Sequence, residues 1–123
     1  MIIGLGIDVV ETDRMLPHIE DHAFMKRFLH EREYQEILQS RESRQILLAS
    51  RFAVKEAFGK ATGLGMRGMG FPEIELSHDK LGKPLLLLHG GAKRIFESLE
   101  AEHLHVTLTH GLSVAAAVVI IER

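Results

Sequence analysis

SRQILLASRFAVKEAFGKA, residues 43–61, is the longest helical pattern in this chain of 123 residues. It contains no proline, and its small and apolar side chains return every three or four residues. Gly63 follows two residues later, where glycine commonly ends a helix. We therefore expect a long helix, whose recurring positions are Ile46, Leu47, Ala49, Ser50, Ala53, Val54, Ala57 and Ala61.

The chain before this helix begins with a strand pattern. Residues 2–10 are apolar at both parities, as expected of a strand buried on both faces. Thr12 or Asp13 is expected to cap a helix that follows directly. Residues 23–40 predict one or two short amphipathic helices, and Glu33 fits the surface of such a helix.

After the long helix the pattern changes to hairpins. Residues 74–77 and 85–88 predict two strands joined by a turn-rich loop, and residues 105–110 and 113–121 predict a second pair joined through Gly111. Between the two hairpins a short helix is indicated by Ala92, Ile95, Phe96 and Leu99.

The order of these elements predicts an α+β fold with a largely antiparallel sheet and packed helices. A chain of this length is expected to form a single domain, residues 1–123. Residues 113–121 are apolar at both parities. Either helices cover a central strand there, or another subunit covers one of its faces.

The composition excludes several classes of protein. Cysteine is absent, so there is no disulfide, no thiolate nucleophile and no cysteine-ligated metal, and the chain fits a reducing compartment. The formal net charge of −2 argues against a wholesale binder of nucleic acid or anionic membranes. No apolar run approaches the roughly 18 residues of a membrane span. We expect a cytosolic protein with no nucleic-acid partner and no membrane segment.

Asp8 is the most informative single residue. A carboxylate between Ile7 and Val9 in a strand is costly to bury unless it is paired or coordinated. One interpretation is an ion pair with a lysine or arginine of a helix, and the other is a ligand for a hard cation. Gly4 and Gly6 leave space on the same face.

Glu56 and Lys60 stand four residues apart on the long helix and project side by side with Phe52. The ordinary interpretation is a surface ion pair worth about 0.3–0.5 kcal/mol. Because the helix is otherwise largely apolar, the alternative is the edge of a cleft. There Glu56 would bind magnesium and Lys60 a phosphate.

The stretch Gly63–Gly68 matches the pattern G-x-G-x-x-G of dinucleotide-binding folds. We reject that interpretation, because here the glycines follow a helix and lead into a strand, the reverse of the order in that fold. Flexible turning and close approach of the backbone to a ligand remain as explanations.

Four segments together resemble one family in order and spacing: GIDVV (6–10), RFAVKEAFGKA (51–61), GKP (82–84) and HVTLTH (105–110). Over essentially its whole length the chain resembles holo-acyl-carrier-protein synthase, the small bacterial 4′-phosphopantetheinyl transferase family. The F-x-x-K-E-A-x-x-K element combined with the early G-I-D element is far more specific than any single motif above.

The resemblance implies a magnesium-dependent enzyme with the 4′-phosphopantetheinyl transferase-like fold. Such an enzyme transfers the 4′-phosphopantetheine arm of coenzyme A to a serine of apo-acyl carrier protein and releases adenosine 3′,5′-bisphosphate. Asp8 and Glu56 match the family's metal carboxylates, and Lys60 matches the lysine that contacts the phosphates. The segments that line the coenzyme A cleft in the family here contain Arg51, Gly63, Gly65, Pro84, His105, Thr109 and His110.

The resemblance also implies a homotrimer with coenzyme A between neighbouring subunits, and an acidic carrier of fatty-acid biosynthesis as partner. Basic residues of the first helices meet that carrier in the family, and Arg14, Lys26 and Arg27 are the candidates here. Two local departures are Gly59 inside the helix and the absence of an aromatic residue from segment 109–113. The competing hypotheses are a non-catalytic coenzyme A-binding regulatory or scaffold protein and a structural oligomeric module without a ligand.

Overall fold

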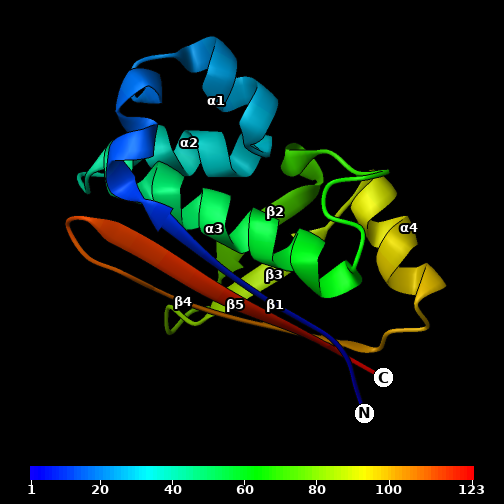
Figure 1. Ribbon diagram of the computed structural model, residues 1–123. Helices are drawn as coiled ribbons and strands as arrows, with labels where there is room; N and C mark the ends of the chain where they lie inside the picture. Colours follow the sequence, from blue (N-terminus) through cyan, green and yellow to red (C-terminus); the bar gives the residue numbers. More distant parts are fainter.

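A computed structural model describes all of the chain, Met1–Arg123. Three layers are visible in Figure 1: a three-stranded sheet, one long helix lying across it, and two short helices on the other side of that helix. The elements are β1 (Ile2–Glu11), the 3-10 helix η1 (Thr12–His18), α1 (His22–Phe28), α2 (Glu31–Gln39), α3 (Arg44–Thr62), the 3-10 turn η2 (Phe71–Glu73), β2 (Ile74–His78), β3 (Pro84–Leu88), α4 (Gly90–Ser98), β4 (His103–His110) and β5 (Val114–Glu122).

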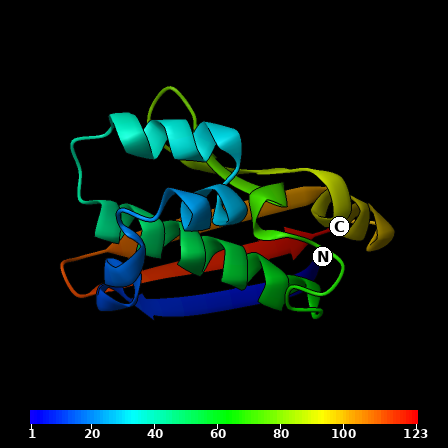
Figure 2. The same ribbon diagram turned by 90° about the horizontal axis from the view of Figure 1, so that it is seen from above.

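The strands form two separate antiparallel sheets. One has the order β1-β5-β4 and the other consists of β2 and β3. Viewed from above, α3 runs along β1 and β5 (Figure 2). Asp8 pairs with Ala117, and Thr109 pairs with Ala116, so two of the predicted site residues lie on the two edge strands, opposite neighbouring residues of the central strand β5. The predicted order of elements and the α+β class are confirmed, although the strands divide between two sheets. No helix is long and apolar enough to cross a membrane.

Only one face of β1 is buried, which corrects the expectation of a strand covered on both sides. Leu5, Ile7 and Val9 expose 64%, 58% and 59% of their surface. The other parity, which includes Gly6 and the fully buried Val10, faces α3. We call Leu5, Ile7 and Val9 the outer strip; nothing in a single chain covers it.

The close approach of α3 to β1 depends on two glycines. A Cβ atom on Gly4 would collide with the backbone oxygen of Ala61, and one on Gly6 would collide with that of Ala57. The space that the sequence left beside Asp8 is therefore filled by the helix backbone. This contact sets where Glu56 and Lys60 of α3 lie along the length of β1.

Replacing Gly6 by alanine is expected to lower the free energy of unfolding by about 3 kcal/mol, because strand and helix must separate to admit the methyl group. Urea unfolding followed by circular dichroism measures the change. Gly111→Ala is the matched control, since a Cβ atom there meets no neighbour within 4 Å. Equal losses in the two variants would contradict this account of the packing.

The segment between β1 and α3 differs from the prediction in two ways. Residues 12–18 form a 3-10 helix, and neither Thr12 nor Asp13 caps it, because Glu11 occupies the N-cap position. The Thr12 hydroxyl instead donates a 2.6 Å hydrogen bond to the carbonyl oxygen of Leu112 and so ties η1 to the β4–β5 turn. The two short helices expected in residues 23–40 are present as α1 and α2.

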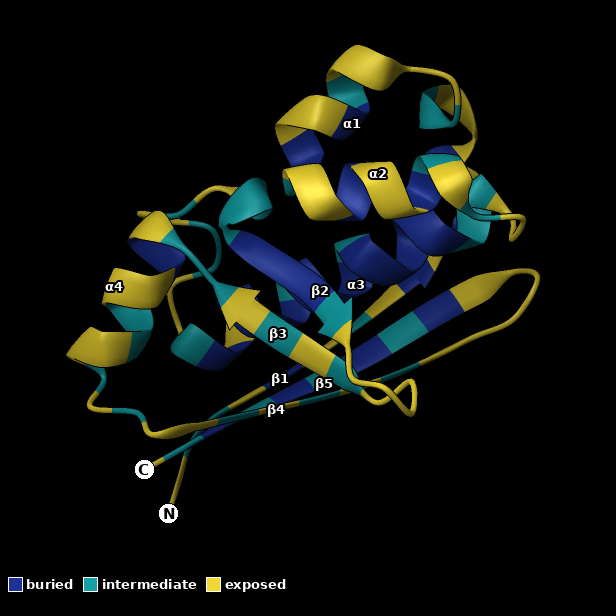
Figure 3. Cartoon of the chain, turned by 180° about the vertical axis from the view of Figure 1, so that it is seen from behind, coloured by how far each residue is buried: buried dark blue, intermediate teal, exposed yellow.

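Glu33 is buried, not at the surface as the pattern of α2 indicated. Its exposed fraction is 1%, and its Oε1 accepts a 2.6 Å hydrogen bond from the Nζ atom of the fully buried Lys55. Lys55 also donates to the carbonyl oxygens of Phe71 and Ile74. Burial lowers the pKa of Lys55, and the neighbouring Glu33 carboxylate opposes that shift. This network joins α2, α3 and β2 in the dark core of Figure 3.

Candidate functional site

Asp8 and Lys60 come together at the edge of the sheet formed by β1, and Glu56 lies on the same side of α3 as Lys60. Lys60 Nζ donates a 2.9 Å hydrogen bond to Asp8 Oδ1 and a 3.0 Å bond to the carbonyl oxygen of Ile7. The Asp8 side chain is 15% exposed and that of Lys60 is 53% exposed. Glu56 is half-buried one helical turn before Lys60 and takes part in no hydrogen bond or ion pair. The ion-pair interpretation of Asp8 therefore describes the protein as it stands.

The same donor set suits a hard divalent cation. Asp8 and Glu56 offer carboxylate oxygens, the ligand type that Mg²⁺ prefers, and the Glu56 carboxylate has no protein partner to give up. Asp8 has a single ammonium partner, on a flexible side chain that can turn to another anion. The residues thus fit a magnesium site beside a mobile positive charge.

Phe52 extends this stripe of α3 toward the N-terminal helices. The Arg14 guanidinium lies over the Phe52 ring at 4.8 Å from the centroid. On α1, Lys26 lies over the ring of Tyr34, while Arg27 is exposed and unpaired. Of the three basic candidates, the structure places Arg14 next to the Phe52–Glu56–Lys60 stripe and the other two on α1.

The glycine-rich loop folds back onto the end of α3. Gly63 ends the helix with φ 81°, and Gly65 has φ 62°, a backbone conformation that favours glycine. The Gly65 amide donates a 3.0 Å hydrogen bond to the Gly59 carbonyl oxygen, and a Cβ atom on Gly59 would meet the Gly65 backbone. Gly59, which appeared as a departure from the family pattern, is the residue that admits this contact.

Glu73 anchors the far end of the loop. Its two carboxylate oxygens accept 2.7 Å hydrogen bonds from the amides of Gly70 and Gly91. The Gly70 amide, more than that of Gly91, lowers the pKa of Glu73 below its usual 4.5, and partial burial opposes the shift. The loop is thereby tied to the start of α4.

Because the folded-state pKa of Glu73 is lowered, its charge stabilises the fold above about pH 4.5, and this contribution is lost as the pH falls through the lowered value. Glu73→Gln is expected to have a lower urea midpoint than the unchanged protein at pH 7, and the gap should close on acidification. Glu97→Gln, on the exposed side of α4, serves as control. A gap that is constant across pH would contradict the role of the charge.

A second group of predicted residues surrounds two hollows on the other side of α3. Arg51 and His110 line a cavity of about 260 Å³, and Pro84, Thr109 and His110 line an adjoining hollow of about 360 Å³. The Arg51 side chain is 4% exposed, and its Nε atom has no hydrogen-bond partner. Sequence reasoning missed the other lining residues, among them Ser50 and His78. His78 was detectable as the partner of Pro84 in the predicted hairpin.

The two groups lie on opposite sides of α3. At about 100° per residue, Glu56 is about 140° and Lys60 about 180° around the helix from Arg51. Gly63 is also twelve residues beyond Arg51, or about 18 Å along the axis. Asp8 belongs to β1 and His110 to β4, which are the two edge strands of the sheet. One chain therefore carries two groups that face away from each other.

His105 joins neither group. Its Nε2 atom lies 2.6 Å from Glu122 Oε1, on the exposed face of β4 and β5, where His105 is paired with Ile120. The His105 ring lowers the pKa of Glu122. The structure thus leaves His105 apart from the other predicted cleft residues. The remaining seven lie in the two groups or in the glycine-rich loop: Arg51, Lys60, Gly63, Gly65, Pro84, Thr109 and His110.

The model of the 4′-phosphopantetheinyl transferase superfamily matches residues 4–119. The chain belongs to this superfamily. Among curated members, the holo-[acyl-carrier-protein] synthase of Treponema denticola is 43% identical over 122 residues, which cover 99% of both chains.

Solved structures of the superfamily share the whole fold. The holo-[acyl-carrier-protein] synthase of Neisseria meningitidis has a TM-score of 0.91 and 33% identity over 100% of both chains. The Bacillus anthracis enzyme, solved in complex with coenzyme A (3′,5′-ADP), has a TM-score of 0.83 and 34% identity over 99% of this chain and 97% of that one. The predicted resemblance to this transferase family is confirmed.

Proposed function

We propose that this chain is a holo-[acyl-carrier-protein] synthase that transfers the 4′-phosphopantetheine group of coenzyme A to a serine of apo-acyl carrier protein and releases adenosine 3′,5′-bisphosphate. The observation that carries the proposal is the pairing of Asp8 with Lys60, one helical turn from Glu56, in a chain of this superfamily. Two carboxylates and an ammonium suit a pyrophosphate substrate, because the carboxylates bind the cation that accompanies it and the ammonium binds its oxygens.

Each of the three side chains has a distinct part in the reaction. Lys60 exchanges Asp8 for a phosphate oxygen when coenzyme A binds and places its positive charge against the pyrophosphate. Asp8 and Glu56 would hold Mg²⁺, which would supply charge neutralisation for the leaving group. Glu56, which has no partner in the resting protein, is also available to accept the serine proton.

The two groups on opposite sides of α3 support a homotrimer. If the Arg51 group of one chain faces the Asp8 group of the next, each contact is head-to-tail, and three such contacts close a ring. Coenzyme A would then lie between chains, with the Arg51 guanidinium and His110 as its second set of contacts. The exposed outer strip supplies apolar surface for such contacts.

The carrier protein is the second substrate. We assign its docking to Arg14, Lys26 and Arg27, and its place to fatty-acid biosynthesis in the cytoplasm, as the family resemblance implies. No nucleic acid and no membrane takes part. Arg14 is the strongest of the three candidates, because its guanidinium lies over Phe52 in the Phe52–Glu56–Lys60 stripe.

Arg14→Glu is expected to raise the KM for carrier protein about tenfold and to leave the KM for coenzyme A unchanged, because it replaces attraction for an acidic partner by repulsion. Initial rates at varied carrier concentration measure the effect. Lys93→Glu makes the same charge change on α4, away from the stripe, and should leave both constants unchanged. A carrier KM that does not respond to Arg14→Glu would remove this residue from the docking surface.

Intact-mass spectrometry of apo-acyl carrier protein incubated with this protein, coenzyme A and magnesium tests the reaction itself. We expect the carrier to gain the mass of one phosphopantetheine arm, and to gain nothing in samples that lack magnesium. A gain of mass without metal would support the transferase activity but reject the metal-binding role of Asp8 and Glu56. No gain with several carriers, together with retained coenzyme A binding, would favour a regulatory or scaffold protein.

A further inference from the structure

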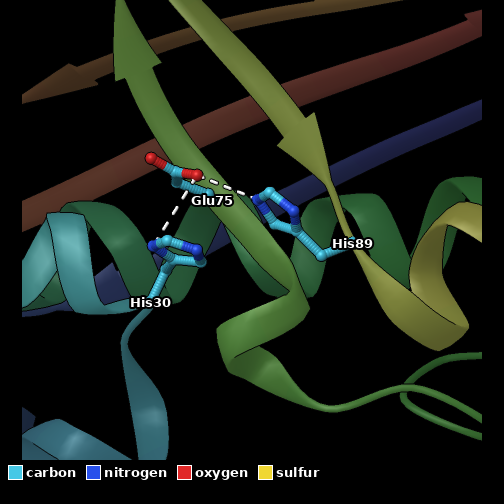
Figure 4. Close-up of side chains that lie close together, drawn as sticks. All are labelled: His30, Glu75 and His89. Carbon is cyan, nitrogen blue, oxygen red and sulfur yellow. Dashed lines mark hydrogen bonds and ion pairs between the residues drawn. The ribbon is translucent and has the colours of Figure 1, made fainter.

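Two histidines converge on a buried carboxylate far from Asp8 in the chain (Figure 4). His89 Nε2 lies 2.9 Å from Glu75 Oε1, and His30 Nδ1 lies 3.7 Å from the same oxygen. The two imidazole rings stack with centroids 4.7 Å apart. The Glu75 side chain is only 3% exposed, so its position is fixed by packing.

The three side chains come from three different elements. His30 is the N-cap of α2, Glu75 lies in β2, and His89 follows β3 as the N-cap of α4. One ligand atom from each lies within 4.8 Å of the other two. Tetrahedral Zn²⁺ with bonds of about 2.1 Å holds its ligands about 3.4 Å apart. Small side-chain rotations from the observed positions therefore meet this geometry.

We propose that His30, Glu75 and His89 form a binding site for a divalent transition-metal ion, with Zn²⁺ as the preferred occupant. Two imidazoles and one carboxylate are a donor set that Zn²⁺ accepts, with a fourth position left for water. Imidazole nitrogen is a poor ligand for Mg²⁺, which prefers oxygen. The chemistry of the donors thus separates this site from the carboxylate pair Asp8 and Glu56.

Arg32 holds the place of the metal in the metal-free protein. Its Nε and Nη2 atoms donate hydrogen bonds of 2.8 and 2.6 Å to the two oxygens of Glu75. The Arg32 side chain is 64% exposed, so it can turn into solvent without leaving a cavity. The buried Glu75 charge is then balanced by the metal ion. Affinity for the metal is set by competition with this arginine.

The protons on the ring nitrogens of His30 and His89 do not prevent a metal ion from replacing Arg32. His30 Nδ1 accepts a 3.0 Å hydrogen bond from the Arg32 amide, so this nitrogen carries no proton, and its lone pair becomes available to a metal ion when that bond is given up. His89 contacts Glu75 through Nε2, and a shift of its proton to Nδ1 frees Nε2 as a ligand. Because His30 lies between α1 and α2, a bound ion would tie these helices to β2 and to the start of α4.

Cobalt and zinc titrations of the full chain test the proposal. We expect Co²⁺ to bind one per chain with the absorption of a tetrahedral site, and Zn²⁺ to displace it. His89→Ala should weaken binding at least about tenfold, while Arg32→Met should strengthen it by removing the competitor. His89 makes no side-chain cap contact with α4, so its loss should leave the fold intact. His103→Ala, an exposed histidine elsewhere, is the matched control and should bind as the unchanged protein does.

Several outcomes would overturn the site. They are failure of the unchanged protein to bind either metal, binding that appears only in Arg32→Met, and binding that His89→Ala leaves intact. Asp8→Asn separates this proposal from the transferase mechanism, because it should leave Co²⁺ binding unchanged. Loss of Co²⁺ binding in that variant would place the ion at the carboxylate pair and reject the histidine site.

Discussion

Replacing Asp8 by asparagine is expected to lower turnover at saturating coenzyme A and carrier protein by about a thousandfold. The change keeps the size of the side chain and removes one negative charge, so the magnesium ligand is weakened and the ion pair with Lys60 is lost. The Lys60 ammonium then has no carboxylate partner, and Glu56 is the one carboxylate left to bind the metal. Phosphopantetheine transfer measured by intact mass over time gives the rate.

Glu97→Gln is the control for this variant, because it makes the same change at an exposed carboxylate of α4 that has no ion pair. Its rate should equal that of the unchanged protein. The unfolding temperature of Asp8→Asn should not fall, since Asp8 is a site residue and not part of the apolar core. Turnover within a few fold of the unchanged protein at limiting magnesium would disprove the ligand role.

Mixing two inactive variants is expected to restore activity. Glu56→Gln damages the group on one side of α3, and Arg51→Met damages the group on the other while keeping most of the side-chain volume. Each variant alone should lose nearly all transfer. When the two are unfolded together in equal amounts and refolded, an undamaged Glu56 group can face an undamaged Arg51 group of the next chain.

Random assembly into closed rings predicts recovery of about a quarter of the full rate, because each site needs two undamaged halves with an even chance of each. Refolding each variant separately and mixing afterwards, with no time for exchange, is the control and should restore nothing. If all site residues came from one chain, the mixture would stay inactive, and the shared-site proposal would be rejected.

The positions of Asp8, Glu56 and Lys60 were the part of the molecule most open to prediction from sequence. The four-residue spacing of Glu56 and Lys60 fixes their common side of a helix, and α3 runs over Arg44–Thr62 against an expected 43–61. Asp8 stood out because a strand rarely buries a carboxylate. Both inferences rest on local geometry, which a single sequence contains.

The errors came from long-range contacts that local patterns do not encode. Glu33 has the spacing of a surface residue, yet Lys55 on another helix makes its burial possible. The apolar parity of β1 suggested burial on both sides, but nothing in the pattern indicates whether the cover comes from the same chain. Gly59 acquires its meaning only when the loop places Gly65 against it.

The outer strip also matters for the newly synthesised chain. β1 is an edge strand, so Leu5, Ile7 and Val9 present apolar side chains beside unpaired backbone groups. Such an edge is a template for unwanted pairing with other newly made chains. β1 and its partner β5 are the first and last strands in this sequence, so β1 stays unpaired until β5 has been made. The rate of translation and the binding of chaperones to β1 would then determine the yield of folded enzyme per mRNA.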